Sequence, residues 1–186
     1  MSRITDLIAF HEGYRGTCYK DTKDFWTWGY GWCLETRPLT MPEAMEICQL
    51  APGDYSPEWL LVLPRLMKVL DGLQEREKYL VARFMLDKEI KHATQQLPNK
   101  IPCWENLNEV RQAALTDLSY NMGIQGLLGF RNTLLSVCQS AWDDAARRLL
   151  DSTYARETKT RAIRIAKMLK TGKWPDDVPW SEDASK

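Results

Sequence analysis

The hydrophobic residues near the N-terminus recur at helical spacing. Four residues lie three or four positions apart and so share one face of a helix: Ile4, Leu7, Ile8 and His11. This spacing predicts a short helix over residues 3–11, with Ser2 as its N-cap. Glu12 falls at or just beyond the C-terminal end of this helix.

The pattern changes between residues 17 and 31, where aromatic and β-branched residues flank a polar turn at residues 21–24. Such residues favour strands, and a polar turn between two such runs predicts a small hairpin or sheet. Asp21 lies where the first predicted strand meets the turn.

After Pro42 nearly all apolar runs have helical spacing. The stretch 74–93 predicts a long, charged helix of the kind that can join two lobes. Residues 106–121 predict a buried helix, and Gly123 marks its end.

Charge and hydropathy narrow the classes of partner. The 25 basic and 25 acidic residues balance, so the sequence does not indicate a nucleic-acid partner. Residues 147–173 are locally basic, which fits either a solvated helix face or attraction to an anionic cell envelope. The longest apolar run, 59–73, is broken by Pro64, Arg65 and Lys68, so we expect no stable membrane insertion.

The cysteines and the N-terminus indicate a compartment. Five widely spaced cysteines without a C-x-x-C pair favour reduced thiols in a cytosol: Cys18, Cys33, Cys48, Cys103 and Cys138. The N-terminal run contains charges and lacks a small-residue cleavage site, so it does not resemble a signal peptide. We therefore expect the protein to be kept in the cytoplasm.

Two acidic residues are candidates for catalysis. Glycoside hydrolysis needs one protonated carboxyl group and a second, ionised one. Glu12 lies beside Phe10 and Tyr14, whereas Asp21 lies in a polar turn, so their environments can separate their pKa values. Spacing alone does not distinguish this pair from solvated surface carboxylates.

Metal and cofactor motifs are not evident in the sequence. His11-Glu12 lacks the second histidine of H-E-x-x-H, because position 15 is Arg15. The sequence therefore implies neither a metal nor a cofactor.

Residues 12–31 resemble the catalytic segment of the phage lysozymes of the T-even type, glycoside hydrolase family 24. Three elements match in register: Glu12, Tyr19-Lys20-Asp21-Thr22 and Thr27-Trp28-Gly29-Tyr30-Gly31. Two further similar blocks lie at 110–134 and 161–174, so the resemblance covers nearly the whole chain.

The resemblance implies an α+β fold class, with a two-lobed lysozyme-like fold made of a small N-terminal sheet lobe and a larger helical lobe. It predicts one catalytic domain over residues 1–175. The polar, proline-containing composition of residues 176–186 predicts a frayed tail. Within the domain the expected parts are a smaller lobe at 13–73, a helical lobe at 1–12 and 94–175, and a connecting helix at 74–93.

The resemblance also implies roles for individual residues. Glu12 becomes the general acid, Asp21 the second carboxylate and Thr27 the hydroxyl that helps to place the attacking water. Arg161 matches the arginine that pairs with the acid glutamate. We expect Arg161 and Asn121 to help bind the substrate.

Trp32 departs from the family pattern, which commonly has histidine at this position. Alternating aromatic residues on a strand can stack on sugar rings or fill a core, and among these Trp32 is the best candidate for a cleft: Trp26, Trp28, Tyr30 and Trp32. The stretch 35–73 also matches the compact family members poorly.

The implied function is that of a monomeric endolysin that cuts the β-1,4 bond between N-acetylmuramic acid and N-acetylglucosamine in peptidoglycan. It would wait in the host cytoplasm and depend on a separate holin to reach the periplasm. Two alternatives remain open: a peptidoglycan-binding or virion-structural protein without turnover, and a lytic transglycosylase.

Overall fold

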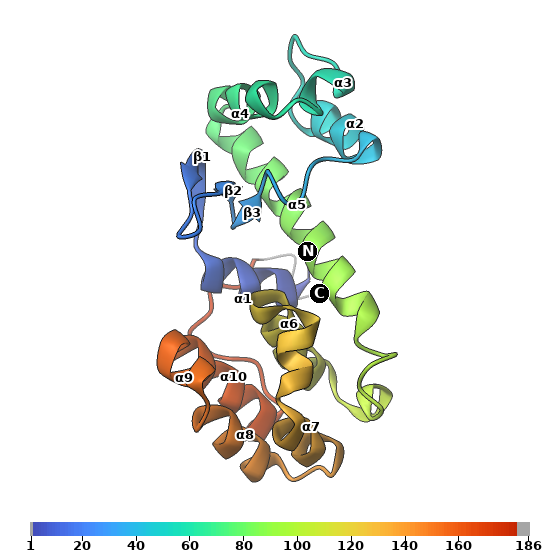
Figure 1. Ribbon diagram of the computed structural model, residues 1–186, viewed down its shortest axis with the longest axis vertical. Helices are drawn as coiled ribbons and strands as arrows, with labels where there is room; N and C mark the ends of the chain where they lie inside the picture. The colour runs from blue at the N-terminus through green and yellow to red at the C-terminus, as the bar shows by residue number, and fades with distance from the viewer. Residues whose placement is uncertain (1, 182–186) are drawn as a thin grey trace. The chain divides into compact units, whose positions relative to one another are not determined.

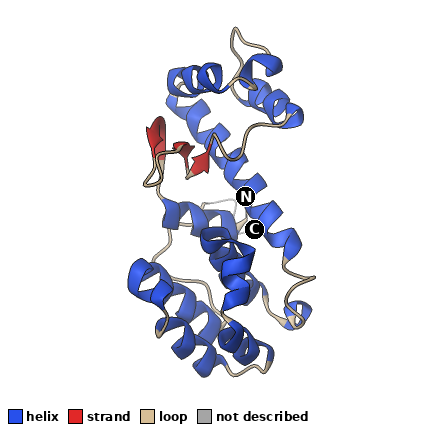
Figure 2. Cartoon of the chain, in the orientation of Figure 1, coloured by secondary structure: helices blue, strands red, loops and turns tan. Residues whose placement is uncertain are grey.

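The computed structural model describes residues 2–181 and has an α+β fold, as the sequence predicted. A small three-stranded sheet is combined with a larger number of helices (Figures 1 and 2). The chain divides into two compact units. We call Glu12–Lys88 the sheet unit, and Met1–His11 with Glu89–Lys186 the helical unit.

The sheet is antiparallel with strand order β1-β2-β3, and it confirms the predicted hairpin. The strands are β1 Arg15–Lys20, β2 Trp26–Gly29 and β3 Trp32–Cys33. The register of β1 shifts between Arg15 and Tyr19, so β1 bulges there.

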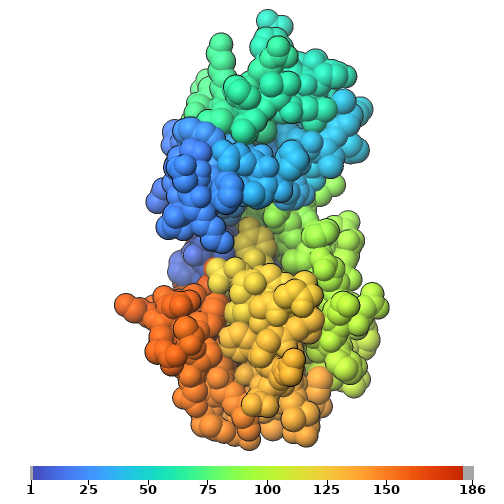
Figure 3. Space-filling model, viewed as in Figure 1, coloured from blue at the N-terminus to red at the C-terminus, as the bar shows by residue number. Residues whose placement is uncertain are grey.

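The stretch that matched the lysozyme family poorly forms three helices in the sheet unit. They are α2 Met41–Leu50, α3 Pro57–Leu60 and α4 Leu63–Gly72, and they make one continuous surface, light blue to green in Figure 3. Glu43 closes a capping box with Thr40 at the start of α2. The core beneath these helices includes Trp28, Ile47 and Leu70, each 0% exposed.

Two helices contain the boundaries between the units. The first, α1, is Arg3–Glu12, which confirms the helix predicted over residues 3–11. The second, α5, is Glu75–Gln96, where the sequence predicted a helix at 74–93. Sequence periodicity located both helices to within a few residues.

The helical unit contains η1 Trp104–Asn106, α6 Glu109–Gly129, α7 Arg131–Cys138, α8 Trp142–Leu150, α9 Thr153–Thr158 and α10 Thr160–Thr171. The side chain of Asn108 caps α6 by accepting a hydrogen bond from the Arg111 backbone N–H at 3.0 Å. Gly123, with a φ of 76°, kinks α6 where the sequence predicted an end. Helix α8 packs against α7 and α10 (Figure 1).

The expectation of five reduced cysteines is wrong. Cys103 and Cys138 are joined by a disulfide, and their Cα atoms are 5.2 Å apart. The fold brings together two residues separated by 35 positions, which no short motif announces. Cys18, Cys33 and Cys48 carry free thiols.

The expectation of a frayed tail after residue 175 is also wrong as far as Ser181. Val178 is buried in the core of the helical unit, and the rings of Trp180 and Trp174 lie 5.4 Å apart. The Ser181 hydroxyl and backbone N–H both donate to Asp6, each at 2.9 Å. Apolar anchors in a polar segment account for this packing, and residues 182–186 lie outside the described residues.

Candidate active site

Glu12 is the last residue of α1 and is half-buried in the sheet unit. Gly31, which follows the hairpin, lies next to it: a Cβ atom added there would be 3.7 Å from Glu12 Oε2. Gly31 has a φ of 88°, a conformation that residues with a side chain rarely adopt. Glycine at this position therefore fits the turn that lies beside the carboxyl group of Glu12.

Asp21 opens the turn that follows β1, and its carboxylate is oriented by that turn. Its Oδ1 atom accepts hydrogen bonds from the backbone N–H groups of Lys23 at 2.8 Å and Phe25 at 2.9 Å. This is an Asx turn, in which the side chain takes the place of a backbone carbonyl. Within residues 2–181, Oδ2 of Asp21 makes no hydrogen bond, so it can serve another partner.

Thr27 lies in the middle of a row of residues across the sheet. It is paired with Tyr19 of β1 and with Cys33 of β3, and paired residues point to the same face. Thr27 is 3% exposed, and its hydroxyl donates to the Phe25 carbonyl at 3.2 Å. We call the face that carries Tyr19, Thr27 and Cys33 the threonine face of the sheet.

Tyr19 connects the candidate catalytic residues electrostatically. Burial raises the pKa of its phenol, the Arg15 guanidinium lowers it, and the carboxylates of Asp21 and Glu12 raise it. The net pKa is raised, so the phenol stays protonated at neutral pH. Glu12, Asp21 and Thr27 therefore all lie in the surroundings of Tyr19.

Tyr19 belongs to the Tyr-Lys-Asp-Thr motif, but the sequence predicted no functional role for it. The signal that could have found it is its place in the hairpin, two residues before the turn and opposite Thr27. Tyr14 was also passed over: it is 37% exposed, and its ring lies 5.3 Å from that of Tyr30. An exposed aromatic ring is more available to a sugar than a buried one.

The structure does not support Trp32 as a residue that stacks on a sugar. Trp32 pairs with Trp28 on the face opposite the threonine face, and it is only 4% exposed. Its indole N–H donates to the Arg37 carbonyl at 2.9 Å. The strand register turns Trp32 into the core of the sheet unit, which corrects the prediction of a cleft residue.

Arg161, in the helical unit, is 9% exposed and pairs with Asp117 through its Nε atom at 2.8 Å. Asp117 is fully buried and also lies 2.8 Å from Nδ1 of His11. An arginine within 2.8 Å of His11 Nε2 can only donate, so Nε2 accepts and Nδ1 carries the proton given to Asp117. The pairing of Arg161 with Glu12 stays a prediction.

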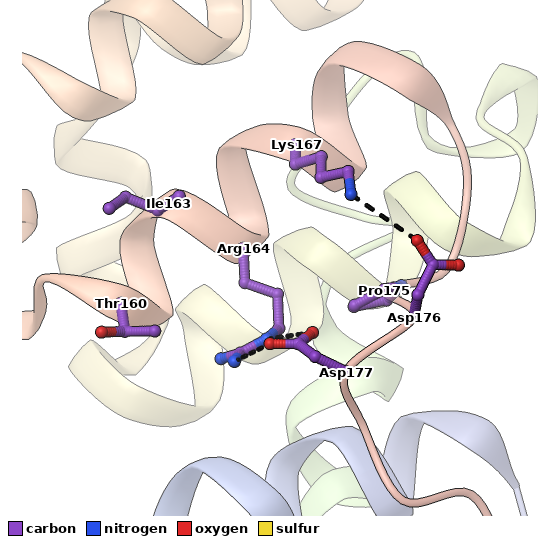
Figure 4. A pocket seen from close by; sticks show the side chains of 7 residues that line it. All are labelled: Thr160, Ile163, Arg164, Lys167, Pro175, Asp176 and Asp177. Atoms are coloured by element: carbon purple, nitrogen blue, oxygen red, sulfur yellow. Dashed lines mark hydrogen bonds and ion pairs between the residues drawn. The ribbon is translucent and has the colours of Figure 1, made fainter.

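The arginine beside His11 is Arg164 on α10, and two further hydrogen bonds of its guanidinium go to Asp177. The two bonds measure 3.1 and 2.6 Å and form a bidentate pair (Figure 4). Lys167 and Asp176 lie 3.7 Å apart at the same pocket. The charged groups that line this pocket are thus paired with one another, and these ion pairs account for the charges found there.

Asn121 is exposed on α6, two residues before the kink at Gly123. Its role in substrate binding stays a prediction. In the described part of the chain, no group of three or more potential metal ligands gathers, and no helix has the length and hydropathy of a membrane span.

The α+β fold described above is consistent with a lysozyme-like fold, and comparison with known proteins points in the same direction. The chain is 22% identical over 179 residues to "Probable T4-type lysozyme 1" of Dictyostelium discoideum. It is 24% identical over 173 residues to "Probable T4-type lysozyme 2" of the same organism. Each match covers 92% of this chain and 96% of the relative.

A shorter match is with the pre-baseplate central spike protein Gp5 of Enterobacteria phage T4. It has 32% identity over 71 residues, which is 38% of this chain and 12% of that protein. No family model matches the chain. Together the relatives confirm the resemblance to T4-type phage lysozymes that the sequence indicated.

Proposed function

We propose that this protein is an N-acetylmuramidase that hydrolyses the β-1,4 bond between N-acetylmuramic acid and N-acetylglucosamine in bacterial peptidoglycan. The observation that carries the proposal is that Asp21 and Thr27 lie on one hairpin, with Thr27 opposite Tyr19, and that the carboxylates of Asp21 and Glu12 both raise the pKa of Tyr19. Relatives named lysozyme that align over 92% of the chain support it.

In the proposed reaction Glu12 is the general acid. It gives its proton to the glycosidic oxygen as the bond from that oxygen to the anomeric carbon breaks. A water molecule attacks the same carbon from the opposite side of the sugar and forms the new bond. Asp21 accepts the proton that the water loses, and Thr27 helps to orient the water, so the configuration at the anomeric carbon is inverted.

The environment of Asp21 supports its part in this scheme. Two backbone N–H groups hold Oδ1 in the turn, and Oδ2 remains available to accept a proton from water. A base whose orientation is fixed before the substrate arrives loses little freedom in the reaction. The Asx turn therefore serves both the fold and the proposed chemistry.

For the biological role we propose an endolysin that accumulates in the host cytoplasm and acts on peptidoglycan in the periplasm as a monomer, with passage provided by a separate holin. The Cys103–Cys138 disulfide supports work in the periplasm, because disulfides persist in oxidising compartments. The resemblance to a phage spike protein raises a second candidate, wall cleavage during entry, but that match covers only 71 residues.

The test is digestion of purified peptidoglycan with analysis of the product ends by mass spectrometry. The wild-type protein should release fragments with reducing muramic ends, and Glu12→Gln should release none. Glu105→Gln, an exposed glutamate on η1, is the matched control and should leave release unchanged.

Other products would contradict the proposal in different ways. Fragments ending in 1,6-anhydromuramic acid would identify a lytic transglycosylase. Binding of the protein to peptidoglycan without any release would instead identify a protein that has no turnover.

A further inference from the structure

The ring of Tyr19 makes a cation–π contact with an arginine from its own strand. The Arg15 guanidinium lies over the ring, 4.3 Å from its centroid. On a regular strand, residues four apart are separated by about 13 Å. Here four steps along β1, from Arg15 to Tyr19, match only two steps along β2, from Gly29 to Thr27, and this bulge brings the two side chains together.

Within residues 2–181 the hydroxyl of Tyr19 makes no hydrogen bond, and the side chain is half-buried. Its raised pKa keeps it protonated, so it is a hydrogen-bond donor at neutral pH. An aromatic ring has few rotatable bonds, so its hydroxyl loses little conformational entropy when it binds a ligand.

The Tyr19 hydroxyl lies near the residues that we propose carry out the reaction. Tyr19 is directly opposite Thr27, and its phenol lies within the electrostatic reach of both Glu12 and Asp21. In the proposed reaction the scissile bond lies near those carboxylates, and the sugars on either side of it are then near the Tyr19 phenol. Sugar oxygens are hydrogen-bond acceptors, and a phenol matches them.

We propose that Tyr19 is a further substrate-binding residue, whose hydroxyl donates a hydrogen bond to an oxygen of the sugar next to the bond that is cut, and that Arg15 positions its ring. This inference rests on the proposed muramidase function. It adds a binding residue that the assignment of Glu12, Asp21 and Thr27 does not include.

The first test is Tyr19→Phe, which removes the hydroxyl and keeps the ring. We expect kcat/KM for peptidoglycan to fall about tenfold, the usual scale for one neutral hydrogen bond. The thermal midpoint should stay nearly unchanged, because the hydroxyl makes no hydrogen bond within residues 2–181. Tyr79→Phe, at an exposed tyrosine on α5, is the matched control and should be as active as wild type.

The second test asks whether Arg15 acts through Tyr19. Arg15→Met keeps a long side chain and removes the cation. We expect kcat/KM for peptidoglycan to fall about threefold. In the variant that combines both changes the loss should equal that of Tyr19→Phe alone, because a ring without its hydroxyl has nothing left to position.

The outcomes separate this inference from the proposed function. If the wild-type protein releases no fragments, the muramidase proposal fails. If the wild-type protein is active and Tyr19→Phe retains its full kcat/KM, the role of the Tyr19 hydroxyl is overturned. If the losses of the two single variants multiply in the combined variant, Arg15 does not act through Tyr19.

Discussion

The two units differ in how they use polar groups. In the helical unit, the buried Asp117 is satisfied by His11 and Arg161, and Arg164 is shared between His11 and Asp177. In the sheet unit, Asp21 keeps one oxygen available and the Tyr19 hydroxyl has no partner in the described chain. Groups with satisfied bonds stabilise a fold, whereas groups with spare capacity can bind and react.

The cysteines follow the same contrast. The helical unit contains the Cys103–Cys138 disulfide, and the sheet unit contains the three free thiols, Cys18, Cys33 and Cys48. We therefore expect changes in the helical unit to act mainly on stability. Changes at the hairpin should act mainly on activity.

The largest effect should follow from Asp21→Asn. The asparagine oxygen can still accept the two backbone hydrogen bonds of the turn, so the fold should survive, but the amide cannot act as a base. We expect peptidoglycan hydrolysis to fall by about 10²–10⁴-fold with an unchanged thermal midpoint. The control is Asp24→Asn in the same turn, where asparagine tolerates the φ of 65°. Full activity of Asp21→Asn would remove Asp21 from the mechanism.

The next effect should be the loss of stability in Asp117→Ala. The change leaves His11 and Arg161 without their shared acceptor in a buried environment. Removing one partner of such a pair costs about 3–5 kcal/mol in the free energy of unfolding, measurable by urea titration. Asp151→Asn, which removes a surface partner of Arg147, should cost no more than about 1 kcal/mol. Equal losses in the two variants would mean that the buried pairs of Asp117 stabilise the fold no more than a surface pair does.

Removing the disulfide should have a somewhat smaller effect. The combined variant Cys103→Ala/Cys138→Ala should lose about 2–4 kcal/mol, because its unfolded state gains freedom across the 35-position separation. A thiol assay of the denatured wild type should find three thiols before reduction and five after. Dithiothreitol should lower the thermal midpoint of the wild type and leave that of the combined variant unchanged. Five thiols before reduction would show that the bond does not form.

The smallest effect should be seen at Glu43, a satisfied carboxylate of the sheet unit. Burial raises its pKa, but hydrogen bonds from Thr40 and Arg37 outweigh burial and hold the pKa below the usual 4.5. A lowered pKa means that the carboxylate stabilises the fold above pH 4.5 and that this stabilisation is lost as the pH falls through the lowered value.

Glu43→Gln tests this titration. The variant should be less stable than wild type by about 1 kcal/mol at pH 7, and the difference should shrink as the pH is lowered below the usual pKa of glutamate. Unfolding in urea at several pH values measures it. A difference that is independent of pH would mean that the charge of Glu43 contributes nothing and that only its shape matters.

Local features of the chain were predictable from the sequence alone. The helix that ends at Glu12 and the hairpin that carries Asp21 and Thr27 follow from spacing and turn residues, which act over a few positions. The motif that aligned these three residues with a known family is equally local. The resemblance to T4-type lysozymes could therefore be recognised before the fold was known.

Contacts between distant segments were decided by the tertiary structure. The sequence permitted Trp32 to face either solvent or core, and the pairing of β2 with β3 turned it to the core. His11 meets Asp117 across 106 positions, and the segment near Val178 packs because an apolar surface is there to receive it. Such contacts depend on which surfaces meet when the chain collapses, and hydrophobic burial has no direction that a short stretch of sequence can encode.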